Sequence, residues 1–466
     1  MKKLLLFLVC LIYLNGFSQC FTSISAGYSH SVGLKPNGTL WSWGMGLNGQ
    51  LGNGTDTDKH SPIQSGTATN WAKFCGGYSN TFAIKSDGTL WGSGYNTYGA
   101  LGIGSVIGHT SNFTQIGTAT NWKEIAAGET YGIGLREDYT MWAWGFNQYY
   151  DLGDGTTTQR NSPVQIGTTA DWKTICATRL QCNFAIKNNG TLWGWGINSG
   201  AVLGDSSVSA WSVPTLRNTA TDWDKLALGH GSHALAIKTD KTLWGWGYGD
   251  FGQTGHDPTT SYANSEFNQI PGLWNAIAVG GDKFSMGIKM DGTLWAWGKN
   301  IVGQLGDGTT NNTYIPMQVG TDTNWVSVSC GYQHTLALKS DGSLWAWGDN
   351  SFGQLGNGGT TALTIPTTIP IAGCTLSAEE FTLTEEVLKV FPNPAQEELS
   401  FSYAGTALIN TVVIYDLSGR EVYNSHPVVS NNLKASFGIG MLQSGSYILS
   451  LKYNEHTVVS KQFLKE

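Results

Sequence analysis

The stretch LWAWGKNIVGQLGDGTT, residues 294–310, holds two tryptophans and four glycines but only two charged residues. A related stretch occurs six more times in the chain. Its Leu-Trp or Met-Trp pair begins at residues 40, 90, 141, 192, 243, 294 and 344, so the interval is 50 or 51 residues. A second tryptophan keeps the same interval at residues 71, 122, 172, 223, 274 and 325, and Phe21 holds that position in the first unit. Self-similarity this regular indicates a repeat architecture.

Each repeat carries the pattern of four short β-strands. NWVSVSCG, residues 324–331, predicts one strand, and HTLALKSDGSLWAWG, residues 334–348, predicts two strands joined at Asp341-Gly342. An Asp-Gly pair suits the positive φ of a tight hairpin turn. A polar loop follows GQLG, and residues 317–319 form the fourth predicted strand, which ends at a glycine. Seven such units predict an all-β, seven-bladed β-propeller in which the repeat tryptophans pack between blades.

The composition excludes one broad class of function. Charged residues make up 13% of the chain, against about 25% in an average domain, and the net charge is −7. Binding to nucleic acid requires a basic surface for the phosphates, which this chain does not offer. We therefore expect no nucleic-acid partner.

The N-terminus predicts export from the cytoplasm. Lys2 and Lys3 precede an apolar run over residues 4–14, and cleavage before Gln19 fits the small residues upstream. The run is too short for a stable membrane span. An alternative is lipidation of Cys20, although residues 17–19 match a lipoprotein cleavage box poorly.

The stretch LWAWGKNIVGQLGDGTT, together with the segment SVSCGYQHTLALKSDG, resembles the regulator of chromosome condensation repeat. The resemblance covers residues 21 to about 371 in seven copies, and it implies the propeller fold and a role in protein binding. The founding member of that family exchanges nucleotide on a small GTPase, an activity that we do not transfer to this exported chain. Secreted bacterial relatives of the fold include inhibitors of β-lactamase.

After Cys374 the repeat ends and the composition changes. The tail, with its short alternating strands, resembles the C-terminal sorting domain of the type IX secretion system of Bacteroidetes-type bacteria. The motif residues that carry the resemblance include Pro392, Asn393, Pro394, Asp416, Gly419 and Arg420. The resemblance implies a small β-sandwich, contact with the secretion machinery, and delivery to the cell surface or the medium. An ordinary adhesive β-sandwich is the alternative.

The predicted organisation has four parts. They are a signal peptide over residues 1–18, a propeller over 19–374, a linker over 375–387 and a sorting domain over 388–466.

Three sets of polar residues are candidate sites. Asp154 and Asp307 follow GQLG-type loops, but one carboxylate per loop suits a turn better than a calcium site. The position of His334 varies among blades, which predicts a packing position with local hydrogen bonds rather than a metal or catalytic role. The variants there are His30, Asn80, Tyr131, Cys182, His233, Phe284 and His334. His230 and His233 lack the further ligands of a zinc site.

Seven cations also recur once per blade. They are Lys35, Lys85, Arg136, Lys187, Lys238, Lys289 and Lys339. They predict either solvated ends of strands or an anion-binding crown on one rim, with an Asn or Asp two residues further on offsetting the charge. We find no catalytic, cofactor-binding or metal-binding set, and we expect no cofactor.

The favoured function is that of a non-enzymatic binding module for an extracellular protein or glycan. Its candidate contact residues are Trp211, His256 and Tyr262, in the two most divergent loops, residues 205–213 and 255–267. Trp211 is the one tryptophan outside the repeat positions. The alternatives are an exported polysaccharide lyase or hydrolase that uses one propeller face, and a protein inhibitor of a secreted enzyme.

The cysteines predict how the ring closes. Cys20 and Cys374 hold the same repeat position at opposite ends of the propeller, so a closed ring brings them together as a disulfide. Cys75, Cys176 and Cys330 replace small residues and are expected to be buried thiols. A bond between Cys176 and Cys182 across a hairpin is the alternative for that pair.

Overall fold

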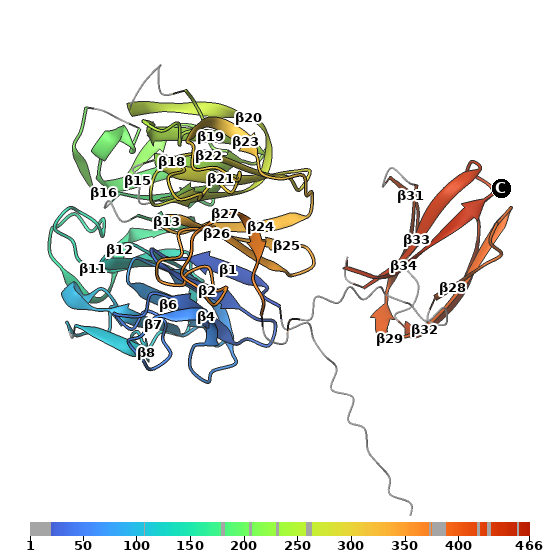
Figure 1. The fold of residues 1–466 in the computed structure, drawn as a ribbon, viewed down its shortest axis with the longest axis horizontal. Coiled ribbons are helices and arrows are strands. Elements are labelled where there is room, and N and C mark those ends of the chain that lie inside the picture. The colour runs from blue at the N-terminus through green and yellow to red at the C-terminus, as the bar shows by residue number, and fades with distance from the viewer. Residues whose placement is uncertain are drawn as a thin grey trace, which may run out of the picture. The chain divides into compact units, whose positions relative to one another are not determined.

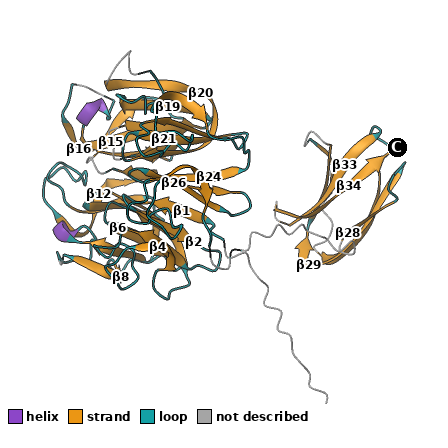
Figure 2. Ribbon diagram, viewed as in Figure 1, coloured by secondary structure: helices purple, strands orange, loops and turns teal. Residues whose placement is uncertain are grey.

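The computed structural model describes residues 20–106, 108–178, 182–204, 207–229, 233–257, 263–371, 374, 388–416, 420–425, 430–453 and 456–466. The predicted signal peptide and linker lie outside these residues. The chain divides into two compact units, residues 1–376 and 377–466, which are described separately. Figure 2 shows that strands dominate both units, with short 3₁₀ turns at η1 (Thr97–Gly99) and η2 (Ser199–Ala201).

The first unit is a seven-bladed β-propeller, as the repeat predicts (Figure 1). Blade 1 contains β1 (Ser23–Ala26), β2 (His30–Leu34), β3 (Leu40–Gly44) and β4 (Lys59–Gln64). Blade 2 contains β5 (Trp71–Gly76), β6 (Asn80–Lys85), β7 (Leu90–Tyr95) and β8 (His109–Gln115). Blade 3 contains β9 (Trp122–Ala127), β10 (Tyr131–Arg136), β11 (Thr140–Gly145) and β12 (Arg160–Ala170). Blade 4 contains β13 (Trp172–Ala177), β14 (Cys182–Lys187), β15 (Leu192–Ile197) and β16 (Ala210–Asn218).

The remaining blades continue the pattern. Blade 5 contains β17 (Trp223–Leu228), β18 (His233–Lys238), β19 (Thr242–Tyr248) and the first part of β20 (Ala263–Gly280). Blade 6 contains the last part of β20, β21 (Phe284–Lys289), β22 (Leu294–Gly298) and β23 (Thr313–Gln318). Blade 7 contains β24 (Trp325–Cys330), β25 (His334–Lys339), β26 (Leu344–Gly348) and β27 (Leu363–Thr368). Because β20 runs through two blades, they form one continuous seven-stranded sheet.

The first tryptophan of each repeated stretch stabilises the hairpin of its own blade. In blade 6, Asp291 accepts hydrogen bonds from the backbone N–H (3.0 Å) and the hydroxyl (2.6 Å) of Thr293. The Thr293 hydroxyl oxygen in turn accepts a bond from Nε1 of Trp295 (2.8 Å). The same relay recurs as Asn37-Thr39-Trp41, Asp87-Thr89-Trp91, Asp138-Thr140-Trp142, Asn189-Thr191-Trp193, Asp240-Thr242-Trp244 and Asp341-Ser343-Trp345. The sequence pattern Asx-Gly-Thr-Leu-Trp is therefore turn chemistry.

The second tryptophan joins neighbouring blades. Nε1 of Trp347 in blade 7 donates to the carbonyl oxygen of Gln304 in blade 6 (2.9 Å), and Trp297 makes the same bond to Gln253 in blade 5 (2.9 Å). Gly306 lies beside the Trp347 ring with φ +79°, and a Cβ there would come within 2.7 Å of Nε1. The glycine that ends GQLG thus makes room for the next blade's indole.

The ring closes without a shared strand. Blades 1 and 7 are each built from one continuous stretch of chain, so they meet side by side. Phe21 and Trp43 of blade 1 pack against an apolar cluster that includes Leu336 of blade 7. The predicted disulfide between Cys20 and Cys374 is present, with Cα atoms 4.8 Å apart. The closure is therefore covalent as well as apolar.

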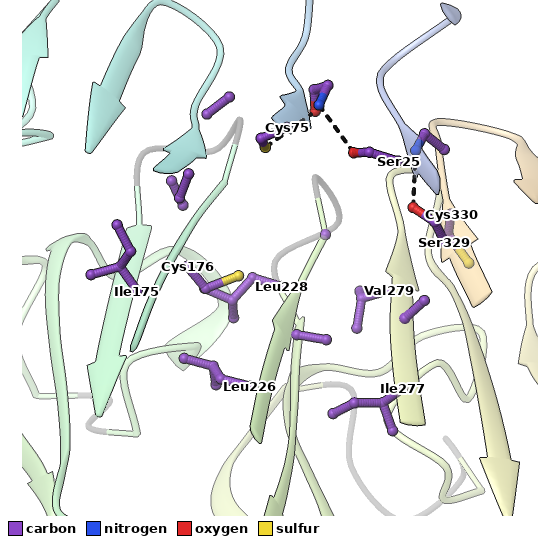
Figure 3. Close-up of a pocket in the computed structure, with 18 of the residues that line it drawn as sticks. Ser25, Cys75, Ile175, Cys176, Leu226, Leu228, Ile277, Val279, Ser329 and Cys330 are labelled. Carbon is purple, nitrogen blue, oxygen red and sulfur yellow. Dashed lines mark hydrogen bonds between the residues drawn. The ribbon is translucent and has the colours of Figure 1, made fainter. Parts of the chain in front are cut away.

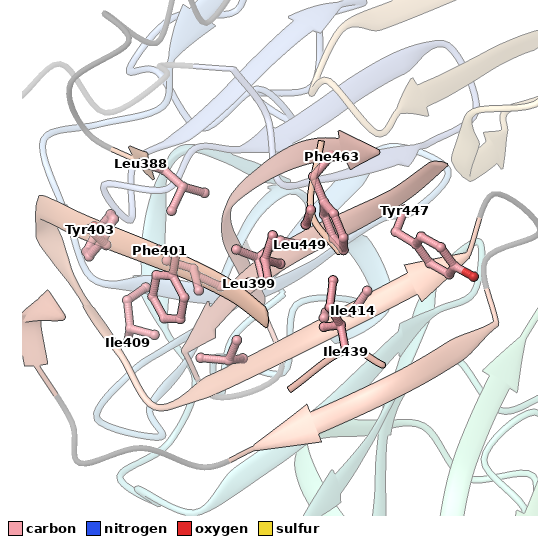
Figure 4. Close-up of a cluster of buried hydrophobic side chains, with 13 residues drawn as sticks. Leu388, Leu399, Phe401, Tyr403, Ile409, Ile414, Ile439, Tyr447, Leu449 and Phe463 are labelled. Carbon is pink, nitrogen blue, oxygen red and sulfur yellow. The ribbon is translucent and has the colours of Figure 1, made fainter. Parts of the chain in front are cut away.

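The second unit is a small β-sandwich. One sheet has the order β28 (Leu388–Phe391), β29 (Glu398–Ile409), β32 (Ser430–Gly438). The other has the order β31 (Glu421–Ser425), β30 (Thr411–Asp416), β33 (Gly445–Tyr453), β34 (His456–Lys465). Its core includes Leu399 and Phe401 from the first sheet and Ile414, Leu449 and Phe463 from the second (Figure 4). This unit therefore has a core of its own.

Candidate functional site

The seven repeat cations are held inside their blades. Nζ of Lys289 lies 3.3 Å from the ring centroid of Trp295 and 5.3 Å from that of Trp274. Every other member lies over the equivalent rings, with Phe21 in place of the tryptophan in blade 1. Such contacts between a cation and an aromatic ring stabilise by about 0.5–2 kcal/mol. The charges therefore lie over the aromatic rings of their own blades instead of extending freely into solvent, and the anion-binding crown stays a prediction.

A central cavity of about 280 Å³ is lined by the first strand of every blade. Cys75, Cys176 and Cys330 contribute thiols to its wall, and Figure 3 shows them around the opening with Ser25 and Ser329. Burial raises the pKa of Cys75 to about 11 and that of Cys176 to about 12, so these thiols are protonated at neutral pH. The three thiols are half-buried where the sequence predicted buried thiols, because the strands that carry them face the cavity.

The wall of this cavity is also tied together around the ring. The Ser25 hydroxyl accepts a hydrogen bond from the backbone N–H of Gly76 (3.0 Å), and the Ser329 hydroxyl accepts one from Ala26 (2.9 Å). These bonds join blade 1 to both of its neighbours.

Three tyrosines gather where the first strands end. Tyr28, Tyr78 and Tyr332, the channel-end tyrosines, come from blades 1, 2 and 7. The Tyr28 ring lies 4.3 Å from that of Tyr78 and 4.3 Å from that of Tyr332, with the latter pair stacked. Backbone bonds from Tyr332 N–H to Tyr28 (3.0 Å) and from Tyr28 N–H to Gly77 (3.0 Å) fix the spacing. The result is a half-buried aromatic cluster at one end of the cavity.

Charged residues form hydrogen bonds and ion pairs beside the channel-end tyrosines. Asp282 accepts bonds from Lys299 (2.9 Å) and from the side-chain amide of Gln333 (2.6 Å). Nζ of Lys283 donates to Asp250 (2.7 Å). The backbone N–H of Asp282 also donates to Tyr332 (2.8 Å), which joins the charged network to the tyrosines.

The channel-end tyrosines were not predicted from the sequence. The available signal was Gly-Tyr at residues 27–28, 77–78 and 331–332, directly after a first strand. Reading that signal requires knowing that neighbouring blades bring the loops together.

The expected loop position of Trp211 is wrong. Trp211 lies in β16, paired with Gly196, and packs half-buried against the apolar clusters of blades 3, 4 and 5. The Arg217 guanidinium lies 4.1 Å from its ring centroid. The divergent loop is shorter than expected because β16 begins at Ala210. A contact role for Trp211 stays a prediction.

Of the other two candidate contacts, the structure describes only His256. His256 lines a pocket between blades 5 and 6, with Nδ1 3.0 Å from the carbonyl oxygen of Thr254. Tyr262 lies outside the described residues, as does His230.

The variable histidine position is a packing position with local hydrogen bonds, as predicted. Nε2 of His30 lies 2.9 Å from the Thr81 hydroxyl, and His334 lies 3.1 Å from that of Ser31. Each bond links the second strands of adjacent blades. Burial lowers the pKa of His30 to about 3 and that of His334 to about 4, so both rings are neutral at ordinary pH.

The loop carboxylates serve turns, as predicted. Asp154 accepts bonds from the Thr156 backbone N–H (2.9 Å) and from Arg160 (2.8 Å), while Asp307 accepts from Thr309 (2.9 Å).

Cys182 is a free thiol 3.4 Å from the Thr178 hydroxyl, so the alternative disulfide to Cys176 does not form.

The tail motifs also have structural partners. Asn393 accepts a bond from the backbone N–H of Leu464 (2.9 Å), which ties the segment around Pro392 and Pro394 to β34. Asp416 accepts bonds from the backbone N–H (3.1 Å) and Nε (3.0 Å) of Arg420 across the turn after β30. Gly419 lies outside the described residues.

Two kinds of domain are matched by family models in this chain. The regulator of chromosome condensation (RCC1) repeat matches residues 37–84, 140–178, 291–338 and 341–377. A second description of the same repeat matches residues 21–50, 223–253 and 325–354. The secretion system C-terminal sorting domain matches residues 389–466. Within the described residues, no helix is long and apolar enough to cross a membrane.

Individual proteins show the same likeness. The ultraviolet-B receptor UVR8 of Arabidopsis thaliana is 29% identical over 67% of this chain and 73% of its own length. The human E3 ubiquitin-protein ligase HERC2 is 26% identical over 46% of this chain, which spans only 5% of HERC2. The crystal structure of Prp20p from Saccharomyces cerevisiae superposes with a TM-score of 0.63 at 17% identity, covering 80% of this chain and 90% of that one. The last likeness shows the fold alone.

Proposed function

We propose that the propeller is a non-enzymatic binding module for an extracellular protein or glycan. The premise is that the chain carries regulator of chromosome condensation repeats and ends in a secretion system C-terminal sorting domain. The sorting domain sends the protein through type IX secretion to the cell surface or the medium. Its partner is then a molecule outside the cell or on its surface.

The channel-end tyrosines carry the proposal. A tyrosine ring offers a large apolar contact area with a polar tip, and such rings are enriched where proteins bind one another. Tyr28 and Tyr332 are already ordered by stacking at 4.3 Å, so little conformational entropy is lost when a ligand covers them. The neighbouring Asp282 and Lys299 add a polar rim to this aromatic cluster.

A double variant with a matched control tests the proposal. Tyr28→Ser with Tyr332→Ser removes the stacked pair, whereas Tyr139→Ser removes an exposed tyrosine from a hairpin at the opposite blade end. Binding of the secreted propeller is measured on a glycan array and by pull-down of surface proteins. We expect the double variant to lose at least tenfold in affinity for any ligand found, while the control keeps it. Equal binding by both variants contradicts this assignment of the binding surface.

The competing class is a polysaccharide lyase or hydrolase that uses one face. Incubating the secreted protein with extracellular polysaccharides tests that class directly. New reducing ends or unsaturated products that disappear in a surface variant would replace the binding proposal with an enzymatic one.

A further inference from the structure

A second pocket lies at the outer seam between blades 5 and 6, apart from the channel-end tyrosines. It has a volume of about 390 Å³, at the small end of the range for ligand sites. The residues that line it are Gly255, His256, Asp257, Pro271, Lys289, Trp295, Ile315 and Pro316. Ile315 is 60% exposed, so the pocket opens on an apolar wall that faces solvent.

The same seam position in blades 3 and 4 holds a pocket of about 330 Å³. Lys187, Trp193 and Pro214 occupy the places that Lys289, Trp295 and Pro316 hold one hundred and two residues later. In this earlier pocket the cation has a carboxylate partner, because Lys187 lies 3.1 Å from Asp171. The repeat therefore supplies an internal control for the later pocket.

Lys289 lacks that partner. Asp171 and Asp222 precede the first tryptophan of blades 4 and 5 and pair with Lys187 and Lys238 at 3.1 and 3.2 Å. Leu273 stands at that place in blade 6, and the structure shows no salt bridge to Lys289 within the described residues. Burial lowers the pKa of Lys289, and the negative charge of Asp291, two residues further along the chain, raises it without forming a salt bridge within the described residues.

The walls around this cation are apolar. Trp295 lies directly under Nζ at 3.3 Å, and Ile315 and Pro316 of β23 complete one side. His256 is held with its two ring nitrogens 3.0 and 3.3 Å from carbonyl oxygens, so its ring forms a fixed wall. Asp257 lines the exposed mouth, and its negative charge disfavours ligands with a second anionic group.

We propose that this seam pocket binds an apolar monocarboxylate, with its carboxylate on Lys289 and its apolar body against Trp295, Ile315 and Pro316. A carboxylate supplies in trans the charge that Asp171 and Asp222 supply in other blades. Both a free aryl or branched-chain acid and the last residue of an apolar peptide present this chemistry. The site is independent of the channel-end surface.

Calorimetric titration of the full secreted chain with two probes separates these sources. The probes are 3-phenylpropionate and the peptide acetyl-Gly-Gly-Phe with a free carboxylate, each compared with its amide. We expect the carboxylate form of at least one probe to bind at least tenfold more tightly than its amide. Binding of the small acid shows that a free acid suffices, whereas binding of the peptide alone identifies a chain terminus as the ligand.

Three variants complete the test. Lys289→Met keeps the apolar stem and removes the charge, and we expect at least a tenfold loss of affinity for the carboxylate. Lys187→Met, in the matched seam, leaves affinity unchanged. Ile315→Asp changes a solvent-facing side chain, so we expect this variant to fold even if Lys289→Met does not. We expect Ile315→Asp to abolish binding of the carboxylate probe. Absence of binding to both probes, or binding unaltered by Lys289→Met and Ile315→Asp, overturns the proposal.

Discussion

Replacing Cys20 and Cys374 with serine removes the covalent link between the first and last blades. The two residues are 354 positions apart, and the loop-entropy relation puts the stabilisation from such a link at about 6 kcal/mol. That figure is an upper bound, because residual structure in the unfolded chain already restricts the loop. We therefore expect the double variant to lose about 2–6 kcal/mol of unfolding free energy.

The structure also predicts where the ring opens. Blades 1 and 7 share no strand, so without the disulfide their seam depends on apolar packing and on bonds such as that from Ala26 to Ser329 (2.9 Å). Cys330 borders this seam, whereas Cys176 lies in blade 4 on the far side of the ring. Local opening should expose Cys330 first.

Denaturant titration and alkylation by iodoacetamide, read by mass spectrometry, measure the two effects. In the wild-type protein the raised pKa of Cys176 and Cys330 predicts slow alkylation, and reductant should accelerate it at Cys330. In the double variant, iodoacetamide should alkylate Cys330 faster than Cys176. Reductant should leave the alkylation rate at Cys330 of this variant unchanged. Equal unfolding midpoints for both proteins, or equal labelling of both thiols, would refute the reasoning.

Four further outcomes are expected. Trp246→Ala should cost about 3–5 kcal/mol in denaturant titrations, because the ring is fully buried and donates across a blade seam at 2.7 Å; a loss under 1 kcal/mol contradicts this. Stability should fall as pH drops from about 6.5 to 4, because His30 and His334 bind protons in the unfolded state but stay neutral in the folded state, where their pKa values are about 3 and about 4. His334→Gln should reduce this loss of stability in acid. Trp211→Ala should lower stability by about 2 kcal/mol, and an unchanged melting temperature would show that its packing contributes nothing. Deleting residues 388–466 should leave a folded propeller inside the cell envelope, since the two units have separate cores; normal amounts of the truncated protein in the medium would refute this.

The fold was predictable because each blade repeats one register. The intervals between Leu-Trp pairs give the blade number, and Asp341-Gly342 marks the hairpin at which the strands reverse. The disulfide was predictable for the same reason, since residues at the same repeat position meet where a ring closes.

The site was less predictable because it depends on contacts between blades. Tyr28 and Tyr332 are distant in sequence, and only the closed ring stacks them. The repeat interval identifies Lys289 as one of seven equivalent cations, but it does not show that the Lys289 side chain lies over the Trp295 ring. The prediction that Trp211 lies in a loop was wrong, because strand β16 begins at Ala210, earlier than the polar residues of this segment indicate.

The direction of the tryptophan bonds between blades has a consequence for the order of folding. Trp144, Trp195, Trp246, Trp297 and Trp347 each donate to a carbonyl oxygen of the preceding blade. In a chain that emerges from its N-terminus, those acceptors are already available when each tryptophan arrives. Trp43 is the exception, because the cluster that it joins includes Leu336 and Leu355 of blade 7, and Gly356 of that blade lies beside its ring. The first blade to emerge is thus the last to complete its core, because part of that core comes from the seventh blade.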